Sequence, residues 1–216
     1  MGTRHQGARH QGGVTTVHNS VKEKLARGEV VASMTVRLVS GVEIVRIAKT
    51  AGFDSIYIDL EHSAFSIETT SQISIMALEA GIPAFVRVPA AEALPALNDA
   101  TMVIVQFESA AALAAMDEIV AIEGVDMVMI GTNDLMADLG IPGQYEHAKV
   151  HDAYARTIAA CRARGKHVGV GGFGTRPDLI EKYVKMGGRY VSTGTDLAFL
   201  MGACMQRAKQ VRDIKI

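Results

Sequence analysis

The sequence feature that most constrains the fold is a repeated alternation of short apolar runs with longer amphipathic stretches. A turn and a stretch of helical periodicity follow most of the runs. The runs predicted as strands are 30–36, 55–59, 84–88, 102–106, 126–130, 167–171 and 190–193. The stretches predicted as helices are 41–51, 67–80, 110–121, 151–164, 177–186 and 196–212. This alternation predicts a parallel α/β sheet, because parallel strands need crossover connections between them.

The length of the chain limits it to one domain. Its 216 residues, 49% of them apolar, can bury one sizeable core but not two. We expect a single barrel domain over residues 21–216. Residues 1–20 contain a near-duplicated polar tract with His5 and His10 and little to bury, so we expect a flexible leader or tag-like segment there.

The alternation breaks at one junction. Between Pro89 and Met102 the sequence offers no complete βα unit. A closed (β/α)8 barrel needs eight units, so the seven counted here predict a barrel that lacks one βα unit at this junction. Both a genuine deletion and a segment left out of the sequence would produce this pattern. We favour the second, because deleting an internal strand would leave unpaired edges on both neighbouring strands.

Composition argues against several classes of partner. The formal charge of −1, the absence of Trp and the 5% aromatic content give no basic, stacking surface for nucleic acid. No apolar run reaches the roughly 18 residues of a membrane span, and no signal peptide pattern is present, so we expect a cytoplasmic protein. Cys161 and Cys204 have no zinc or CxxC spacing, which predicts reduced thiols packed as small apolar residues.

Polar side chains gather where the predicted strands end. They are Asp59, Glu61 and His62 after the second strand, Arg87 in the third, Gln106 and Glu108 at the fourth, and Gly131, Thr132, Asn133 and Asp134 after the fifth. In a parallel barrel these ends face the ligand, whereas the strand bodies fill the core. We therefore expect one site at this end of the sheet.

The types of residue at these ends suggest metal chemistry. Glu108 and Asp134 are carboxylates on adjacent strands with amide and carbonyl groups beside them, which suits Mg²⁺ or Mn²⁺. Arg87 interrupts an apolar strand, where a charge is costly unless it meets an anion. Each residue also has an ordinary explanation: a helix N-cap for either carboxylate, an interface position for His62 and a structural ion pair for Arg87. Their joint occurrence at matching strand ends favours a site.

Four motifs, taken in order, resemble the signature of the HpcH/HpaI aldolase family. They are Ile58-Asp59-Leu60-Glu61-His62, Val86-Arg87-Val88-Pro89, Val105-Gln106-Phe107-Glu108-Ser109 and Gly131-Thr132-Asn133-Asp134-Leu135. The resemblance runs from about Val21 to the C-terminus. It implies a TIM barrel of the phosphoenolpyruvate/pyruvate type. It also implies a class II, metal-dependent aldolase that cleaves 4-hydroxy-2-oxo acids or 2-keto-3-deoxy sugar acids to pyruvate and an aldehyde.

The resemblance also assigns roles. Glu108 and Asp134 would hold the divalent metal, which is Mg²⁺, Mn²⁺ or Co²⁺. Arg87 would contact the pyruvyl oxygens. Asp59 and His62 would form the dyad that moves protons, with His62 as the general base near neutral pH. The metal would stabilise the enolate of pyruvate as a Lewis acid.

Substrate-binding roles fall to Gln106 and to the backbone of Gly131, Thr132 and Asn133, which would bind a carboxylate. The family usually has Gly-Pro-Ala-Asp-Leu-Ser where this chain has Gly-Thr-Asn-Asp-Leu-Met, so the carboxylate contact is altered although Asp134 is kept. The family also has a further strand and a long loop at the short junction, where specificity residues lie.

A class I aldolase would need a Schiff-base lysine at a strand end. The lysines fall instead on predicted helices, on turns or at the opposite end of the barrel: Lys22, Lys24, Lys49, Lys149, Lys166, Lys182, Lys185, Lys209 and Lys215. We therefore expect no Schiff base. We also expect no nucleotide cofactor.

One motif supports a different class of enzyme. Residues 169–174 match G-x-G-x-x-G after a strand, and Asp196 follows Gly174 by 22 residues, which is the dinucleotide-binding spacing. An NAD(P)-dependent oxidoreductase is therefore an alternative, although only one strand and one helix remain after the motif. A non-catalytic barrel is a third reading, if the short junction is a genuine deletion.

The last predicted helix, 196–212, carries more apolar surface than one barrel seam needs. Its large apolar residues are Leu197, Phe199, Leu200, Met201 and Met205. We expect this surface to pack against another subunit. The resemblance implies the same, a homo-oligomer (hexamer or trimer) with exchanged C-terminal helices.

Overall fold

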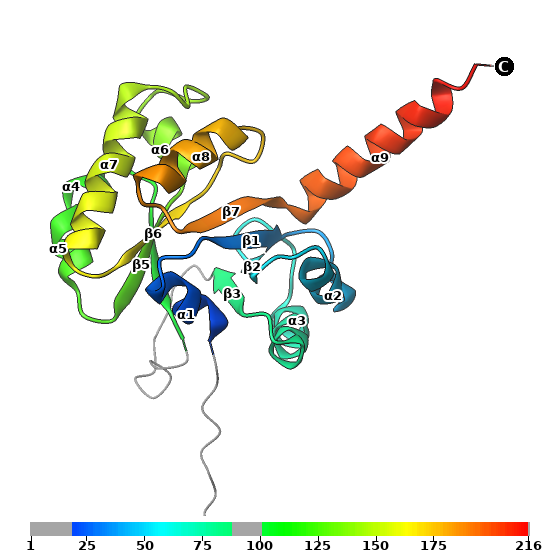
Figure 1. Ribbon diagram of the computed structural model, residues 1–216, viewed down its shortest axis with the longest axis horizontal. Coiled ribbons are helices and arrows are strands. Elements are labelled where there is room, and N and C mark those ends of the chain that lie inside the picture. The colour runs from blue at the N-terminus through cyan, green and yellow to red at the C-terminus, as the bar shows by residue number, and fades with distance from the viewer. Residues whose placement is uncertain (1–18, 88–100, 216) are drawn as a thin grey trace, which may run out of the picture.

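A computed structural model describes residues 19–87 and 101–215. Its strands form one parallel sheet in the order β3-β2-β1-β7-β6-β5-β4, which curls as an incomplete barrel (Figure 1). The strands are β1 (Val31–Val36), β2 (Ser55–Asp59), β3 (Ala84–Arg87), β4 (Val103–Phe107), β5 (Val125–Ile130), β6 (His167–Val170) and β7 (Tyr190–Thr195). The prediction of a parallel α/β sheet is confirmed, and the curl is that of a TIM-barrel-like fold.

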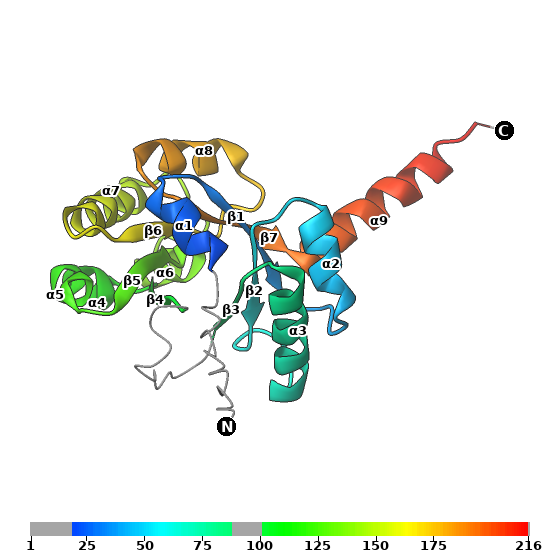
Figure 2. The same cartoon turned by 60° about the horizontal axis from the view of Figure 1, so that its bottom comes forward.

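The helices flank this sheet, with α2 and α3 beside β1–β3 and α4–α8 beside β4–β6 (Figure 2). They are α1 (Ser20–Ala26), α2 (Glu43–Thr50), α3 (Ile67–Ala80), α4 (Ala110–Ala114), α5 (Met116–Ala121), α6 (Thr132–Asp138), α7 (Ala148–Ala163), α8 (Pro177–Met186) and α9 (Asp196–Arg212). Helix α9 projects away from the rest of the molecule. No helix of the described ranges is both long and apolar enough to cross a membrane.

Alternation along β5 shows how the core is divided. Val128 and Ile130 pack into the cluster under α4–α8, whereas Met127 and Met129 face the other side, with Val21 of α1. Successive strand residues point to opposite faces, so one strand supplies both layers. Helix α1 therefore packs on the side of the sheet opposite to α4–α8.

The two edges of the sheet are β3 and β4, which follow one another in sequence. The junction predicted to lack a βα unit lies between them, and it falls outside the described residues apart from Thr101 and Met102. The third strand was predicted to end at Val88. The described residues stop at Arg87, so that last residue is not tested. The missing unit stays a prediction.

Two helices were not predicted. Helix α1 begins inside the expected leader because the Asn19 side chain accepts the backbone N–H groups of Val21 and Lys22, each at 3.2 Å. The rest of that leader, 1–18, lies outside the described residues. Helix α6 begins at Thr132, where a loop was predicted. Both cysteines are free, as predicted. Cys161 is buried as expected, whereas Cys204 is exposed on α9, so its predicted packing is not found within the described chain.

Replacement of Leu135 by Ala tests the core beneath α6. Leu135 is fully buried, so its loss should lower the free energy of unfolding by about 3 kcal/mol. Leu78 of α3 is 65% exposed, and Leu78→Ala should change it by less than about 0.5 kcal/mol. Urea unfolding measures both, and equal effects would contradict this assignment of the core.

Candidate functional site

Asp59 is the centre of a charged cluster at the carboxyl end of the sheet. It ends β2 and its side chain is fully buried. Its Oδ2 accepts from Arg37 Nε at 2.7 Å and pairs with Arg37 Nη2 at 2.6 Å. Its Oδ1 lies 3.3 Å from Arg87 Nε. A buried carboxylate is tolerated when positive charge and hydrogen bonds replace the lost water; Arg37 supplies both here, and Arg87 supplies positive charge.

Asp59 also holds the chain that leads to His62. Its Oδ1 accepts the backbone N–H of Glu61 at 3.1 Å and that of His62 at 3.2 Å. Its Oδ2 lies 3.3 Å from Nδ1 of the His62 ring, whose side chain is 46% exposed. A proton on Nδ1 completes this contact and leaves Nε2 free to accept a proton from a ligand. The predicted dyad is therefore brought together.

Arg87 belongs to the same cluster. It pairs with Asp59 in the β2–β3 register, and its Nη1 forms an ion pair with Glu61. The anions that Arg87 meets are thus carboxylates of the protein, which supports the structural ion pair as one explanation of its position. Its predicted contact with the pyruvyl oxygens stays a prediction.

The charges around Asp59 determine its ionisation. Burial raises the pKa of Asp59, but the positive charges of Arg87 and Arg37 outweigh this effect and hold the pKa below its ordinary value. The carboxylate is therefore ionised at neutral pH. Arg37 was not predicted from the sequence, although it directly follows β1 and so occupies the same kind of strand end as the predicted residues.

A second cluster lies at the ends of β4 and β5. Gln106 Nε2 donates to Glu108 Oε2 at 2.5 Å. A Cβ on Gly131 would lie 2.8 Å from that Gln106 nitrogen and 3.1 Å from Glu108 Oε2, so the backbone of Gly131 is in close contact with both side chains. Of the predicted site residues, Gln106, Glu108 and Gly131 are therefore brought together.

Thr132 and Asn133 begin α6, and their side-chain hydrogen bonds go to residues other than Gln106 and Glu108. Thr132 is buried, and its hydroxyl donates to Gly171 O at 2.7 Å and lies 2.8 Å from Tyr154 OH. Its side chain is therefore used by the fold, and only its backbone is open to the predicted substrate role. Asn133 is exposed and accepts from Tyr145 OH at 2.9 Å.

Among the residues that the structure describes, two sets could hold a metal ion. Ligand atoms of Asp59, Glu61 and His62 lie within 4.8 Å of one another. However, Asp59 already pairs with two guanidinium groups and Glu61 with one of them, so a cation there would compete with arginine.

Glu108 and Asp134 offer the other set. Gly131 N donates to Phe107 O at 3.0 Å, so the two carboxylates leave adjacent, hydrogen-bonded strands. Glu108 is half-buried and contacts a neutral amide, and Asp134 is exposed in the first turn of α6. These oxygen donors fit a hard divalent cation, and their pairing around one ion stays a prediction.

The features that suggested dinucleotide binding have structural explanations. Gly169 and Gly171 lie against the Met129 side chain of β5, and a Cβ on Gly169 or Gly171 would force that side chain to move. The Asp196 carboxylate, whose spacing from the loop suggested this alternative, accepts backbone N–H groups of residues 37–39 and 197.

The lysines lie where they were predicted. Each is on a helix, except Lys166, which precedes β6 at the amino end of the sheet, and Lys215, which follows α9.

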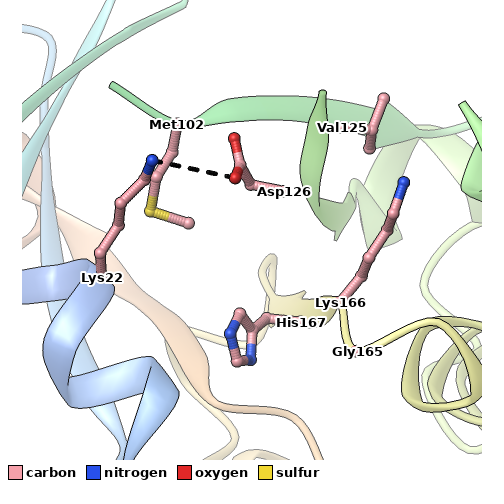
Figure 3. Close-up of a pocket in the computed structure, with 7 residues that line it drawn as sticks. All are labelled: Lys22, Met102, Val125, Asp126, Gly165, Lys166 and His167. Carbon is pink, nitrogen blue, oxygen red and sulfur yellow. Dashed lines mark ion pairs between the residues drawn. The ribbon is translucent and has the colours of Figure 1, made fainter. Parts of the chain in front are cut away.

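A hollow of about 290 Å³ lies at the opposite end of the sheet (Figure 3). Its lining residues are Lys22, Met102, Val125, Asp126, Gly165, Lys166 and His167. Lys22 is 4.0 Å from Asp126, and Lys166 donates to Ile122 O at 2.5 Å. This hollow is at the amino ends of β4–β6, whereas Asp59 and Glu108 lie at the carboxyl ends, so it is separate from the predicted site.

A model of the HpcH/HpaI aldolase/citrate lyase family matches residues 92–203, which is over half of the chain. The chain is 29% identical to a 4-hydroxy-4-methyl-2-oxoglutarate aldolase from Chaetomium globosum, over 76% of this chain and 83% of that protein. It is 27% identical to a protein of the same description from Hapsidospora irregularis, over 92% and 96%. It is also 36% identical to a 2-keto-3-deoxy-L-rhamnonate aldolase from Escherichia coli, over 51% and 41%.

Solved structures share the fold. An HpcH/HpaI aldolase from Desulfitobacterium hafniense aligns with a TM-score of 0.79 at 24% identity, covering 90% of this chain and 97% of that chain. The citrate synthase SbnG aligns with a TM-score of 0.78 at 23% identity, covering 91% and 100%. Proteins described by different reactions therefore share this architecture.

Replacement of Asp59 by Asn tests the charged cluster through its pH dependence. The pKa of Asp59 is lowered by folding, so its contribution to stability is complete above the unfolded pKa of about 3.9 and is lost as the pH falls through the folded value. At pH 7 the variant should lose about 3 kcal/mol of unfolding free energy. Urea unfolding across this pH range should show the difference shrinking in acid; a constant difference would contradict the cluster.

Proposed function

Because the chain belongs to the HpcH/HpaI aldolase/citrate lyase family and is a lyase, we propose that it is a class II, metal-dependent aldolase. Its substrate would be a 4-hydroxy-2-oxo acid or a 2-keto-3-deoxy sugar acid, cleaved reversibly to pyruvate and an aldehyde or ketone. The observation that carries this proposal is the Asp59 carboxylate held between two arginines and against the ring of His62.

The chemistry of this cleavage defines what the site must do. The C4 hydroxyl loses its proton, the C3–C4 bond breaks, and its electron pair passes into the C2 ketone to give the enolate of pyruvate. A proton then returns to C3. The site must therefore supply a base and positive charge close to the ketone oxygen. The substrates named for the related aldolases share this arrangement of hydroxyl and ketone.

Glu108 and Asp134 are the proposed ligands of a Mg²⁺, Mn²⁺ or Co²⁺ ion. When bound, this ion supplies Lewis-acid stabilisation to the ketone oxygen. The oxygen donors and the neutral Gln106 partner of Glu108 support this assignment. The Asp59, Glu61 and His62 set is a weaker candidate because Arg37 and Arg87 already neutralise it.

His62 is the proposed base. With its Nδ1 directed at Asp59, its exposed Nε2 can take the proton of the C4 hydroxyl and later return one to C3. Arg87 adds positive charge on the same side of the sheet. First-turn N–H groups of a helix have no partner within the helix, so those of Thr132 and Asn133 in α6 suit a substrate carboxylate.

The alternatives have less support. The NAD(P)-dependent oxidoreductase rested on the glycine-rich loop and on Asp196, but Gly169 and Gly171 lie against Met129 and the Asp196 carboxylate already binds backbone N–H groups. A non-catalytic barrel depends on the short junction being a genuine deletion, and the contact between Asp59 and His62 favours a catalytic site instead.

We also propose that the chain lacks one βα unit between β3 and β4. The alignment with the Hapsidospora irregularis relative extends over 260 positions, whereas this chain has 216 residues, so at least 44 positions have no residue of this chain opposite them. The sheet edges support placing the gap there, because β3 and β4 are consecutive in sequence and unpaired with each other.

A homo-oligomer, hexamer or trimer, is the proposed assembly. Helix α9 buries only Asp196 within the described chain, and it projects into solvent (Figure 1). Its exposed residues Leu197, Met201, Cys204, Ala208 and Val211 repeat at alternating spacings of four and three. That repeat forms one apolar stripe suited to packing against another helix.

Carboxylate substitutions test the proposed metal ligands. Glu108→Gln and Asp134→Asn should each lower pyruvate formation from a 4-hydroxy-2-oxo acid at least about 100-fold, because each removes an anionic ligand. Divalent metal affinity, measured by chelator competition, should fall with it. Glu118→Gln on the exposed surface of α5 is the control and should change neither quantity. Full activity in both ligand variants would refute the proposal.

A charge on the apolar stripe tests the assembly. Met201→Glu should make the oligomer dissociate into smaller assemblies. A carboxylate at a helix interface loses its hydration, which disfavours the contact between subunits. Gln206→Glu places the same charge elsewhere on α9 and should leave the assembly intact. Size exclusion with light scattering measures the mass; a monomeric unmodified protein would contradict this proposal.

A further inference from the structure

A carboxylate near the C-terminal end of the chain holds the segment that follows β1. Asp196 begins α9 and is 4% exposed. Its Oδ1 accepts the backbone N–H of Arg37 at 3.0 Å, and its Oδ2 accepts those of Leu38 at 2.9 Å and Val39 at 2.8 Å. Three consecutive N–H groups thus point at one buried anion, which fixes the backbone from which the Arg37 side chain leaves.

The Arg37 side chain carries this constraint to the dyad. Its Nε and Nη2 both lie within hydrogen-bond distance of Asp59 Oδ2, at 2.7 and 2.6 Å. That same oxygen faces Nδ1 of His62 at 3.3 Å, while Oδ1 faces Arg87 and two backbone N–H groups. Each oxygen of Asp59 therefore has its own partners, and the carboxylate cannot turn without breaking charged hydrogen bonds.

We infer that Arg37 is a positioning residue for His62, that it acts by fixing the orientation of the Asp59 carboxylate, and that Asp196 anchors it. The inference deepens the proposed aldolase function and rests on it for its kinetic consequence. Without Arg37, Oδ2 loses both charged partners, and the carboxylate is free to turn toward Arg87. The His62 ring then loses the acceptor that holds its proton on Nδ1, and Nε2 is no longer kept as the base.

Direct binding of the substrate by Arg37 is the competing role, because the Arg37 side chain is 35% exposed. The two roles differ in kinetics. If Arg37 bound the substrate, Arg37→Met would raise KM, whereas removal of a positioning residue lowers kcat with little change in KM. We expect kcat to fall at least about tenfold but less than the roughly 10²–10⁴-fold attributed to a general base.

A double-mutant cycle with His62→Asn makes the test specific. If Arg37 acts through His62, Arg37→Met should cost almost nothing once His62 is absent. Arg37→Lys retains one charged hydrogen bond and should recover part of kcat. Arg156→Met removes an arginine that pairs with Asp152 on the exposed face of α7, and it should leave kcat unchanged. Equal losses from Arg37→Met with and without His62 would overturn the inference.

A measurement independent of turnover separates this inference from the proposed function. In ¹⁵N-histidine-labelled protein, the neutral form of the His62 ring should carry its proton mainly on Nδ1. Arg37→Met should shift the proton towards Nε2, and loss of the signal in His62→Asn identifies it. An unchanged tautomer refutes the inference even in an active enzyme. A shifted tautomer in a protein without aldolase activity upholds the positioning and refutes the proposed function.

Discussion

The arrangement at the carboxyl end of the sheet depends on the compensation of one buried charge. Asp59 loses its water on folding, and Arg37 and Arg87 replace that water from the two strands beside β2. Removing either arginine would leave the carboxylate under-compensated, and removing the carboxylate would leave two cations facing each other. The three strands β1, β2 and β3 are thus tied together at the same end where His62 is held.

Parallel pairing is what turns these local contacts into a site. Each strand of the curled sheet ends at the same side, so the residues at the carboxyl ends of β1 to β5 share one rim although the chain separates them widely. The charged cluster sits on one half of that rim, and Gln106, Glu108 and Gly131 sit on the other. The proposed reaction needs both halves, since one supplies the base and the other the metal ligands.

Strand ends were readable from the sequence because burial and polarity change abruptly there. Asp59 and His62 follow an apolar run, and Arg87 interrupts one, so both clusters could be located without coordinates. Arg37 was not predicted as a site residue, because its partner Asp59 is 22 residues away and no local sequence pattern pairs the two. The spacing of Asp196 from the glycine-rich loop suggested a dinucleotide-binding alternative. Its contacts depend instead on the pairing of the first and last strands, which spacing does not reveal. The burial of the Thr132 side chain was also not predicted: its hydroxyl contacts Tyr154 and Gly171, and the predicted role of its backbone stays a prediction.

The most direct measurement is anomalous scattering from crystals of the protein grown with Mn²⁺ and pyruvate. We expect one manganese peak about 2.1 Å from oxygens of both Glu108 and Asp134, with pyruvate beside it and the His62 ring facing the methyl carbon. A peak between Asp59, Glu61 and His62, or a pyruvate bound out of reach of His62, would contradict the proposed site.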